Sequence, residues 1–307
     1  MATLITAPAE YLRERLTSGA KVLLVNPPVQ EKRYHWIRWN QPLELLRLST
    51  WIKETTQSAD VRLFDFMLPG EQGEVPRHKV KETWVGPGAP ALWHFGQPFE
   101  RFDRFLDELV KRRWVPDLIV VSSLTSYWHV AIEKLLLRIC NVLGPTYRPR
   151  TRIALYGAYP YFEPEHAEGQ READLAFAAP VNVSACAPDF ALYFEQHKRP
   201  PLFFGLDIEA ADVSEHLAMC LELQSAWDRR RGMTRPQTIL VAFLNDDICG
   251  PKSQLKELAG KSDRYEGRLR IEAICGVEPR SMAIEHVEML AVLGTKSFCV
   301  EYATNPG

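Results

Sequence analysis

Hydrophobic and polar positions follow two periods along the chain. Five short apolar runs have the composition of buried strands: residues 21–26, 61–66, 117–123, 152–157 and 173–178. Between them, Leu and Phe recur at helical spacing in residues 42–54, 98–113 and about 128–142. Strands separated by helices favour an open, parallel, doubly wound sheet, because parallel strands need crossover connections and are buried on both faces.

The rest of the chain falls outside this alternation. Residues 1–19 form an N-terminal segment, and the sheet domain is expected to span residues 20–200. Within it, residues 67–98 are rich in Gly, Pro and Trp and are expected to form an irregular insertion. Residues 201–307 are expected to form a second domain, in which four apolar runs ("PLFFGLDIEA", "TILVAFLNDDICG", "LRIEAICGV" and "KSFCVEYAT") alternate with helical segments. The sequence therefore predicts an α/β protein with two domains.

Composition excludes several functional classes. The chain has 307 residues, 46% hydrophobic and 25% charged, with a formal net charge of −2. These values are typical of a soluble globular protein and give no electrostatic basis for binding nucleic acid or an anionic membrane. No apolar stretch approaches the roughly 20 residues that span a bilayer, and Glu10 stands where a signal peptide needs an apolar core. We therefore expect a cytoplasmic protein.

The cysteines support that expectation. Six are present, and neighbouring ones lie more than twenty residues apart: Cys140, Cys186, Cys220, Cys249, Cys275 and Cys299. No pair has the short spacing of a zinc or iron–sulfur motif. Buried free thiols in a reducing compartment are the expected state.

The carboxyl ends of the predicted strands are the expected place for a ligand. In open α/β sheets, ligands bind beyond these ends, where the strand order reverses. The loops "NPPVQ", "SSLTSYW" and "GAYPYFEPEHA" qualify, and their candidate contacts are Asn26, Pro27, Ser122, Ser123, Leu124, Thr125, Tyr127, Gly157, Tyr159 and Pro160. Hydroxyl groups suit a polar ligand, glycine permits close approach, and aromatic rings offer flat apolar faces. The alternative is that these residues only satisfy loop backbone and shield the end of the sheet.

Two common nucleotide motifs are missing from these loops. No GxGxxG follows the first strand, which disfavours a dinucleotide, and no GxxxxGK[ST] is present.

The order of the segments carries a resemblance. "VLLVNPP", "PLELLRLSTWIKE", "VRLFDF", "WHFGQPFERFDRFLDEL", "PDLIVVSSLTSYWHVAIE", "RIALYGAYPYFEPEHA" and "ADLAFA" together resemble the N-terminal cobalamin-binding domain of cobalamin-dependent radical S-adenosylmethionine (SAM) enzymes, over residues 20 to about 180. The resemblance implies a Rossmann-like, flavodoxin-like domain whose strand-end loops surround cobalamin. It makes the serine loop at residues 122–128 a cobalamin contact.

The chain departs from that family at two places in this domain. The DxHxxG motif, which supplies a histidine to cobalt in other cobalamin proteins, is replaced by "NPPVQEKR", so we expect cobalamin to bind without a protein histidine on cobalt. Tyr156 stands where the family commonly has the first of two glycines, and its ring is expected to narrow the pocket.

The second domain is similar to the start of a radical SAM (β/α) barrel and departs further. The family's CxxxCxxC loop should follow the first strand, but the chain passes directly from "FFGLDIEA" to "ADVSEHLA". We therefore expect no [4Fe–4S] cluster and no cleavage of SAM, because three thiolates must hold that cluster. Asp207, Asp246, Asp247 and Glu301 fall near strand ends, with His216 and Cys249 nearby. They suit a carboxylate metal site or an acid–base pair, or they cap helices and bond loop amides. His166 in "EPEHAEG" is expected to be a helix-start residue rather than a ligand.

Three functions remain open at this point. In the first, the chain is a cobalamin-binding protein that derives from a radical SAM enzyme, has lost the cluster function, and assists methyl transfer or a partner enzyme. In the second, it is a non-catalytic interaction subunit without cofactor. In the third, it is a metal-dependent enzyme that uses the barrel carboxylates. The last run, "KSFCVEYA", would leave an unpaired strand edge with two apolar faces. We therefore expect a second copy or a separate protein to cover it.

Overall fold

The computed structural model describes much of the first half of the chain and selected parts of the second. The described residues are 1–31, 42–68, 75–80, 92–123, 129–183, 186, 188–197, 203–206, 214, 217–218, 221–222, 224–225, 228–229, 239–243, 252–261, 269–273, 276–277, 282–293 and 299–300. The chain divides into two compact units, residues 1–196 and 197–307, and each is described by itself.

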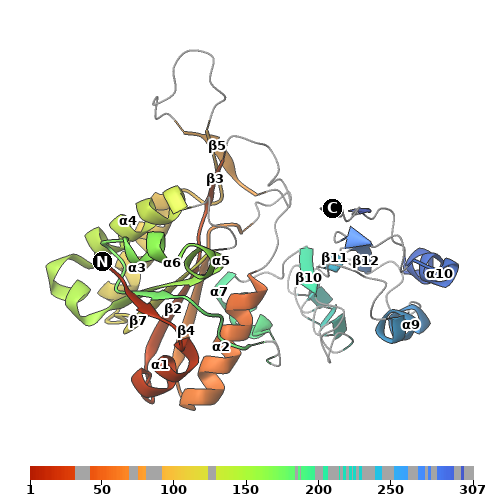
Figure 1. Ribbon diagram of the computed structural model, residues 1–307, viewed down its shortest axis with the longest axis horizontal. Helices are drawn as coiled ribbons and strands as arrows, with labels where there is room; N and C mark the ends of the chain where they lie inside the picture. Colours follow the sequence, from red (N-terminus) through yellow and green to blue (C-terminus); the bar gives the residue numbers. More distant parts are fainter. Residues whose placement is uncertain are drawn as a thin grey trace, which may run out of the picture. The chain divides into compact units, whose positions relative to one another are not determined.

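The first unit is built on a six-stranded sheet (Figure 1). Its strands are β1 (Thr3–Ile5), β2 (Lys21–Asn26), β4 (Asp60–Asp65), β7 (Leu118–Ser123), β8 (Arg152–Gly157) and β9 (Leu175–Phe177). They lie in the order β1-β9-β8-β7-β2-β4, and all neighbours are parallel. The predicted parallel α/β sheet is therefore confirmed, and each of the five predicted apolar runs forms one of its strands.

The strand order reverses beside β2. From β2 the chain crosses to β4 on one side, and it then returns to β7, β8 and β9 on the other side. Counted from β2, these five strands lie in the doubly wound order 2-1-3-4-5. The carboxyl ends of β2 and β7 therefore flank the point where the connections change direction.

The N-terminal segment belongs to this sheet. The sequence pattern separates residues 1–19 from the sheet domain, but β1 pairs with β9 and forms an edge strand. Helix α1 (Pro8–Arg15) follows and buries Leu12. A three-residue strand is too short to show a period, so only its pairing identifies it.

Helices cover both faces of the sheet because alternate strand residues point to opposite sides. Leu23, Val25, Ile119 and Val121 join one core cluster with residues of α3 (Phe99–Lys111), α4 (His129–Tyr147), α5 (Ala158–Phe162) and α6 (Pro164–Glu168). The opposite face of the sheet packs on α2 (Leu43–Thr56). Ser49 Oγ on α2 donates a hydrogen bond to Asp189, which directly precedes α7 (Phe190–His197). Helix α4 bends at Gly144, ahead of Pro145, and leads into the short 3-10 helix η2 (Arg148–Arg150).

The predicted irregular insertion contains a small sheet. Strands β5 (Arg77–Lys79) and β6 (Trp93–Phe95) lie within residues 67–98 and pair in antiparallel fashion with each other, while β6 also pairs with β3 (Val29–Glu31). The prediction of an irregular segment was wrong for these strands, because antiparallel pairing between distant short segments leaves little periodicity in the sequence.

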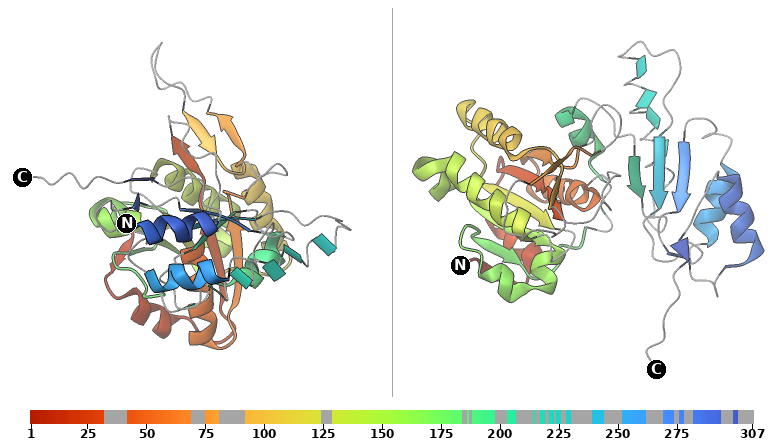
Figure 2. Two further views of the ribbon diagram at one scale, coloured as in Figure 1. Left: turned by 90° about the vertical axis from the view of Figure 1, so that its right-hand side faces the viewer. Right: turned by 90° about the horizontal axis from the view of Figure 1, so that it is seen from above.

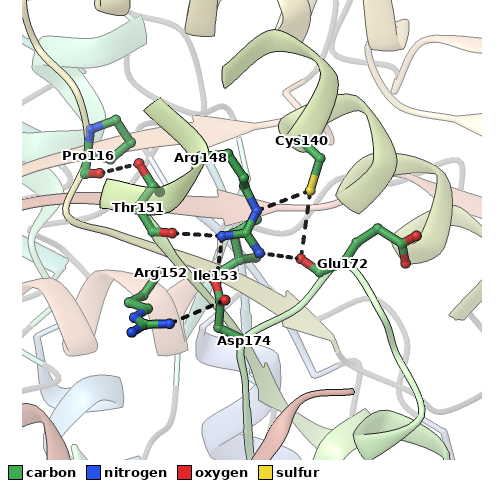
Figure 3. A network of polar contacts seen from close by, with 8 residues as sticks. All are labelled: Pro116, Cys140, Arg148, Thr151, Arg152, Ile153, Glu172 and Asp174. Atoms are coloured by element: carbon green, nitrogen blue, oxygen red, sulfur yellow. Dashed lines mark hydrogen bonds and ion pairs between the residues drawn. The ribbon is translucent and has the colours of Figure 1, made fainter. Parts of the chain in front are cut away.

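One arginine links three elements at the amino edge of the large sheet (Figure 3). The Arg148 guanidinium donates to the carbonyl oxygens of Thr151 at 2.9 Å and Glu172 at 3.0 Å, and it pairs with Asp174 at 2.9 Å. Its Nε also donates to Cys140 Sγ on α4 at 3.3 Å. The network therefore joins the end of α4 to the segments that begin β8 and β9.

The second unit contains three parallel strands in the order β10-β11-β12. They are β10 (Phe203–Leu206), β11 (Ile239–Phe243) and β12 (Leu269–Ala273), and α9 (Lys252–Gly260) and α10 (Ile284–Val292) lie side by side next to them (Figure 2). The fourth predicted run forms β14 (Cys299–Val300), which pairs in parallel with β13 (Gly276–Val277). Residues 301–307 lie outside the described residues, so the expected open edge and its partner stay a prediction. None of the described helices is long and apolar enough to cross a membrane.

Candidate functional site

The structure brings the described candidate residues to one edge of the sheet. Asn26 ends β2, Ser122 and Ser123 end β7, and Gly157 ends β8. In the strand register Ser122 faces Tyr156 and Ser123 faces Gly157. Leu124, Thr125 and Tyr127 lie outside the described residues, as do the barrel candidates Asp207, Asp246, Asp247, Glu301, His216 and Cys249.

Asn26 is held by a carboxylate that sequence analysis missed. Its Nδ2 donates to Asp65 Oδ1 at 2.7 Å across the β2–β4 pair, and the same oxygen accepts from the backbone N–H of Met67 at 2.9 Å. Asp65 is only 2% exposed. The signal was present in "VRLFDF", where an acidic residue occupies the carboxyl end of a buried strand. The Asp65 carboxylate therefore joins the carboxyl ends of β2 and β4 and holds the first turn after β4.

The two serines are buried at the end of β7 rather than exposed to solvent. Ser122 is 6% exposed and Ser123 2% exposed. Ser122 Oγ donates to the carbonyl oxygen of Val25 at 3.4 Å, a long hydrogen bond that links β7 to β2. Both serines are therefore largely shielded from a ligand at this edge.

Gly157 is required by the sheet itself. It has φ of 94°, and a Cβ at this position would lie 2.4 Å from the carbonyl oxygen of Ser123. No other residue type fits this contact without a backbone shift. The glycine lets β7 and β8 stay close at the carboxyl edge and turns the chain into α5, where Tyr159 and Pro160 are both buried.

Tyr156 lies in the core rather than on an open surface of the sheet edge. Its ring is fully buried and contacts Phe177 edge-on, with ring centroids 6.4 Å apart. Its hydroxyl lies beside Glu44, in the first turn of α2. Burial raises the pKa of Tyr156, and the Glu44 carboxylate raises it further. The expectation drawn from sequence therefore needs correction: the ring fills the core between the sheet and α2.

Glu44 is a second acidic group that sequence analysis missed. Burial raises the pKa of Glu44 above its ordinary value, although the Tyr156 hydroxyl and the Arg47 charge act in the opposite direction. The start of an amphipathic helix after a loop was its only sequence signal, and many exposed glutamates share it.

Tyr159 joins the site to the short helices that follow β8. Its hydroxyl lies 2.7 Å from His166 Nδ1 and accepts from Gln170 Nε2 at 3.0 Å. Burial raises the pKa of Tyr159 to about 12, so the hydroxyl keeps its proton at neutral pH. Tyr159 therefore acts as a polar anchor inside the core rather than as an exposed aromatic face.

A groove runs beside the "NPPVQ" segment, between the small antiparallel sheet and the helices α3 and α4. Its volume is about 640 Å³. Its lining residues are Gln30, His78, Lys79, Val80, His94, Phe99, Lys134, Leu137 and Arg138. Gln30 Nε2 donates to His94 Nδ1, whereas Gln30 Oε1 is buried and has no hydrogen-bond partner among the described residues. The groove thus offers cations and an unused buried acceptor, and sequence analysis identified neither.

Comparison with known proteins gives a distant likeness among solved structures. No protein-family model matches the chain, and no curated protein sequence matches it. Among solved structures the chain is similar to an apo, selenomethionine-labelled, cobalamin-dependent S-adenosylmethionine radical enzyme, OxsB, with 16% sequence identity and a TM-score of 0.48. The match covers 92% of this chain and 42% of the enzyme. The chain therefore spans less than half the length of that enzyme.

Proposed function

We propose that the first unit binds a corrinoid of the cobalamin class at the carboxyl edge of its six-stranded sheet. The observation that carries the proposal is the reversal of strand order beside β2, which brings the ends of β2, β7 and β8 to one edge. The resemblance of residues 20–180 to cobalamin-binding domains supplies the ligand class. In this proposal the unit is a flavodoxin-like domain, and the second unit is the start of a radical-SAM-like (β/α) barrel.

The residues of the groove fit the polar periphery of such a ligand. Cobalamin carries amide side chains and one phosphate, so it needs hydrogen-bond acceptors and a cation. The buried Gln30 Oε1 suits an amide N–H, and Lys79 and Lys134 suit a phosphate. When bound, the corrinoid supplies a cobalt atom that can carry a methyl group. The protein's own part is to bind the ligand and orient it.

Equilibrium dialysis of the full chain against hydroxocobalamin tests the proposal. We expect one corrinoid to be retained per chain. Thr125→Trp should weaken retention at least about tenfold, because Thr125 belongs to the proposed corrinoid contacts. Thr17→Trp is the matched control, because Thr17 is exposed in the loop before β2, at the opposite edge. Ser122→Trp is unsuitable because Ser122 is buried in the sheet.

A double substitution, Lys79→Gln with Lys134→Gln, tests the groove. Loss of two cations should weaken retention several-fold at low salt and reduce its dependence on ionic strength, because screening acts on charge pairs. A folded wild-type chain that retains no corrinoid would reject the proposal and favour an interaction subunit without cofactor. Equal retention by Thr125→Trp, Thr17→Trp and wild type would reject the location.

A further inference from the structure

Two metal-binding residue types share one face of α4 at its first turn. His129 begins the helix and Glu133 follows four residues later, a spacing that places both side chains on the same side. Both are partly buried. Neither takes part in the proposed corrinoid contacts.

Helix α6 brings a third residue to this pair. His166 is exposed, and its ring lies edge-on to that of His129 with centroids 4.8 Å apart. One donor atom from each of His129, Glu133 and His166 lies within 4.8 Å of the other two. The packing of α5 and α6 on the sheet end thus converges two imidazoles and a carboxylate.

Two further side chains fix the orientation of these groups. Gln170 is 8% exposed, and its Nε2 donates both to Glu133 Oε1 at 3.2 Å and to the Tyr159 hydroxyl at 3.0 Å. The same hydroxyl lies 2.7 Å from His166 Nδ1, which leaves Nε2 of that ring facing away from the bond. In metal sites, the side chains that bind the metal are regularly oriented by hydrogen bonds to neighbouring buried polar groups.

We infer that His129, Glu133 and His166 form a binding site for one divalent transition-metal ion of the zinc class. Two imidazole nitrogens and one carboxylate are the donor set of three-ligand zinc sites, which leave a fourth position open to water or another small ligand. For bonds of about 2.1 Å in tetrahedral geometry, neighbouring donors are about 3.4 Å apart. Donor atoms that lie up to 4.8 Å apart therefore need to approach one another by up to about 1.4 Å. Rotation of the exposed His166 and partly buried His129 side chains supplies this approach.

The tautomer of His166 follows from this assignment. With Nε2 bound to the ion, Nδ1 carries the proton and donates it to the Tyr159 oxygen. Tyr159 is then a positioning residue, because it acts on the metal only through His166. The site stands independently of the corrinoid proposal, since none of its three ligands lines the groove or belongs to the proposed corrinoid contacts.

Titration of the full chain with Co²⁺, after chelator dialysis and without corrinoid, tests the inference. We expect one Co²⁺ per chain, visible d–d absorption bands from an ordered site, and displacement of Co²⁺ by Zn²⁺. Zn²⁺ should also raise the midpoint of thermal unfolding, because an ion that binds the folded state stabilises it.

Substitutions identify the ligands. His129→Gln, Glu133→Gln and His166→Gln should each weaken Co²⁺ binding at least about tenfold, and Tyr159→Phe should weaken it by about 10- to 100-fold while the absorption bands persist. His78→Gln and Glu165→Gln are the controls, since both residues are exposed and neither belongs to the triad. A folded wild-type chain that binds neither Co²⁺ nor Zn²⁺ would overturn the inference. So would unchanged affinity in the His129→Gln/His166→Gln double variant, and unchanged affinity in Tyr159→Phe would remove Tyr159 from the site.

Discussion

Gly157 is the residue on which the shape of the candidate edge depends most. An added Cβ would meet the Ser123 backbone at 2.4 Å while the residue keeps φ of 94°. We expect Gly157→Ala to lower the free energy of unfolding of the first unit by about 2–4 kcal/mol, because the clash adds to the strain of a positive φ. Urea unfolding followed by circular dichroism measures this.

Gly19 allows the steric clash of an added Cβ to be separated from the strain of a positive φ. It has φ of 81°, but nothing lies within 4 Å of an added Cβ. Gly19→Ala should therefore cost only about 1 kcal/mol, the conformational part alone. Equal losses in the two variants would show that the contact with Ser123 is not the reason for glycine at position 157.

His94 makes stability depend on pH. It is 1% exposed; its Nε2 donates to the carbonyl oxygen of Gln97 at 3.0 Å, and its Nδ1 accepts from Gln30. The pKa of His94 is lowered to about 4, chiefly by burial; the Gln97 carbonyl opposes this shift, and the nearby His78 adds to it. The folded state thus favours neutral His94, while the unfolded chain takes up a proton near the ordinary value of about 6.5.

The sign of the effect follows from this depressed pKa. The stabilisation is complete above about pH 6.5 and is lost as the pH falls towards 4, by about 3 kcal/mol at most. The wild-type chain should therefore lose about 3 kcal/mol more than His94→Gln between pH 7 and pH 4 in urea unfolding. Parallel pH profiles would show that His94 takes up its proton as readily in the folded state as in the unfolded state.

At the scale of elements, the end of α4 depends on Arg148. Its guanidinium joins Thr151, Glu172 and Asp174, and the two ion-pair side chains are 24% and 18% exposed (Figure 3). Arg148→Ala should cost about 1–3 kcal/mol of unfolding free energy, because partly buried carbonyl acceptors and a carboxylate lose their donor.

Arg152 provides the comparison for this network. It approaches the same carboxylate, Asp174, at 3.5 Å but is 65% exposed. Arg152→Ala should change stability by less than about 0.5 kcal/mol, as for other exposed ion pairs. If chemical denaturation gives both alanine variants the same loss, the network does not anchor α4 to the sheet.

At the scale of the whole molecule, the first unit needs its N-terminal residues. β1 pairs with β9, and the backbone N–H of Ala2 donates to Glu168 while that of Ala178 donates to Ile5. Leu12 on α1 is 1% exposed. In a chain that starts at Ala20, the free energy of unfolding of the first unit should fall by several kcal/mol. The edge of β9 would also be exposed, which favours aggregation.

Urea unfolding and light scattering of this truncated chain measure both effects. Leu12→Ala should reproduce part of the stability loss, about 2–4 kcal/mol, without exposing the strand edge. A truncated chain that unfolds at the wild-type urea concentration and stays monodisperse would show that the N-terminal strand does not contribute to the unit.

The sequence by itself determined the main elements of the first unit. Five strands and the helices α2, α3 and α4 were predicted from the order of apolar residues along the chain. A strand buried on both faces is a short continuous apolar run, and a helix buried on one face repeats apolar residues at helical spacing. The parallel arrangement followed from the alternation of strands and helices. The carboxyl-edge positions of Asn26, Ser122, Ser123 and Gly157 followed in turn, since parallel strands end at the same edge.

Only the tertiary structure decided which side chains meet. The pairing of β1 with β9 and the antiparallel sheet of β3, β6 and β5 join short segments far apart in sequence, whose own residues carry no period. His166 looked like an ordinary residue of a helix start, and it meets His129 and Glu133 because α6 packs beside the first turns of α4. Hydrophobic periodicity is a property of neighbouring residues, whereas the convergence of polar groups depends on how separate elements pack.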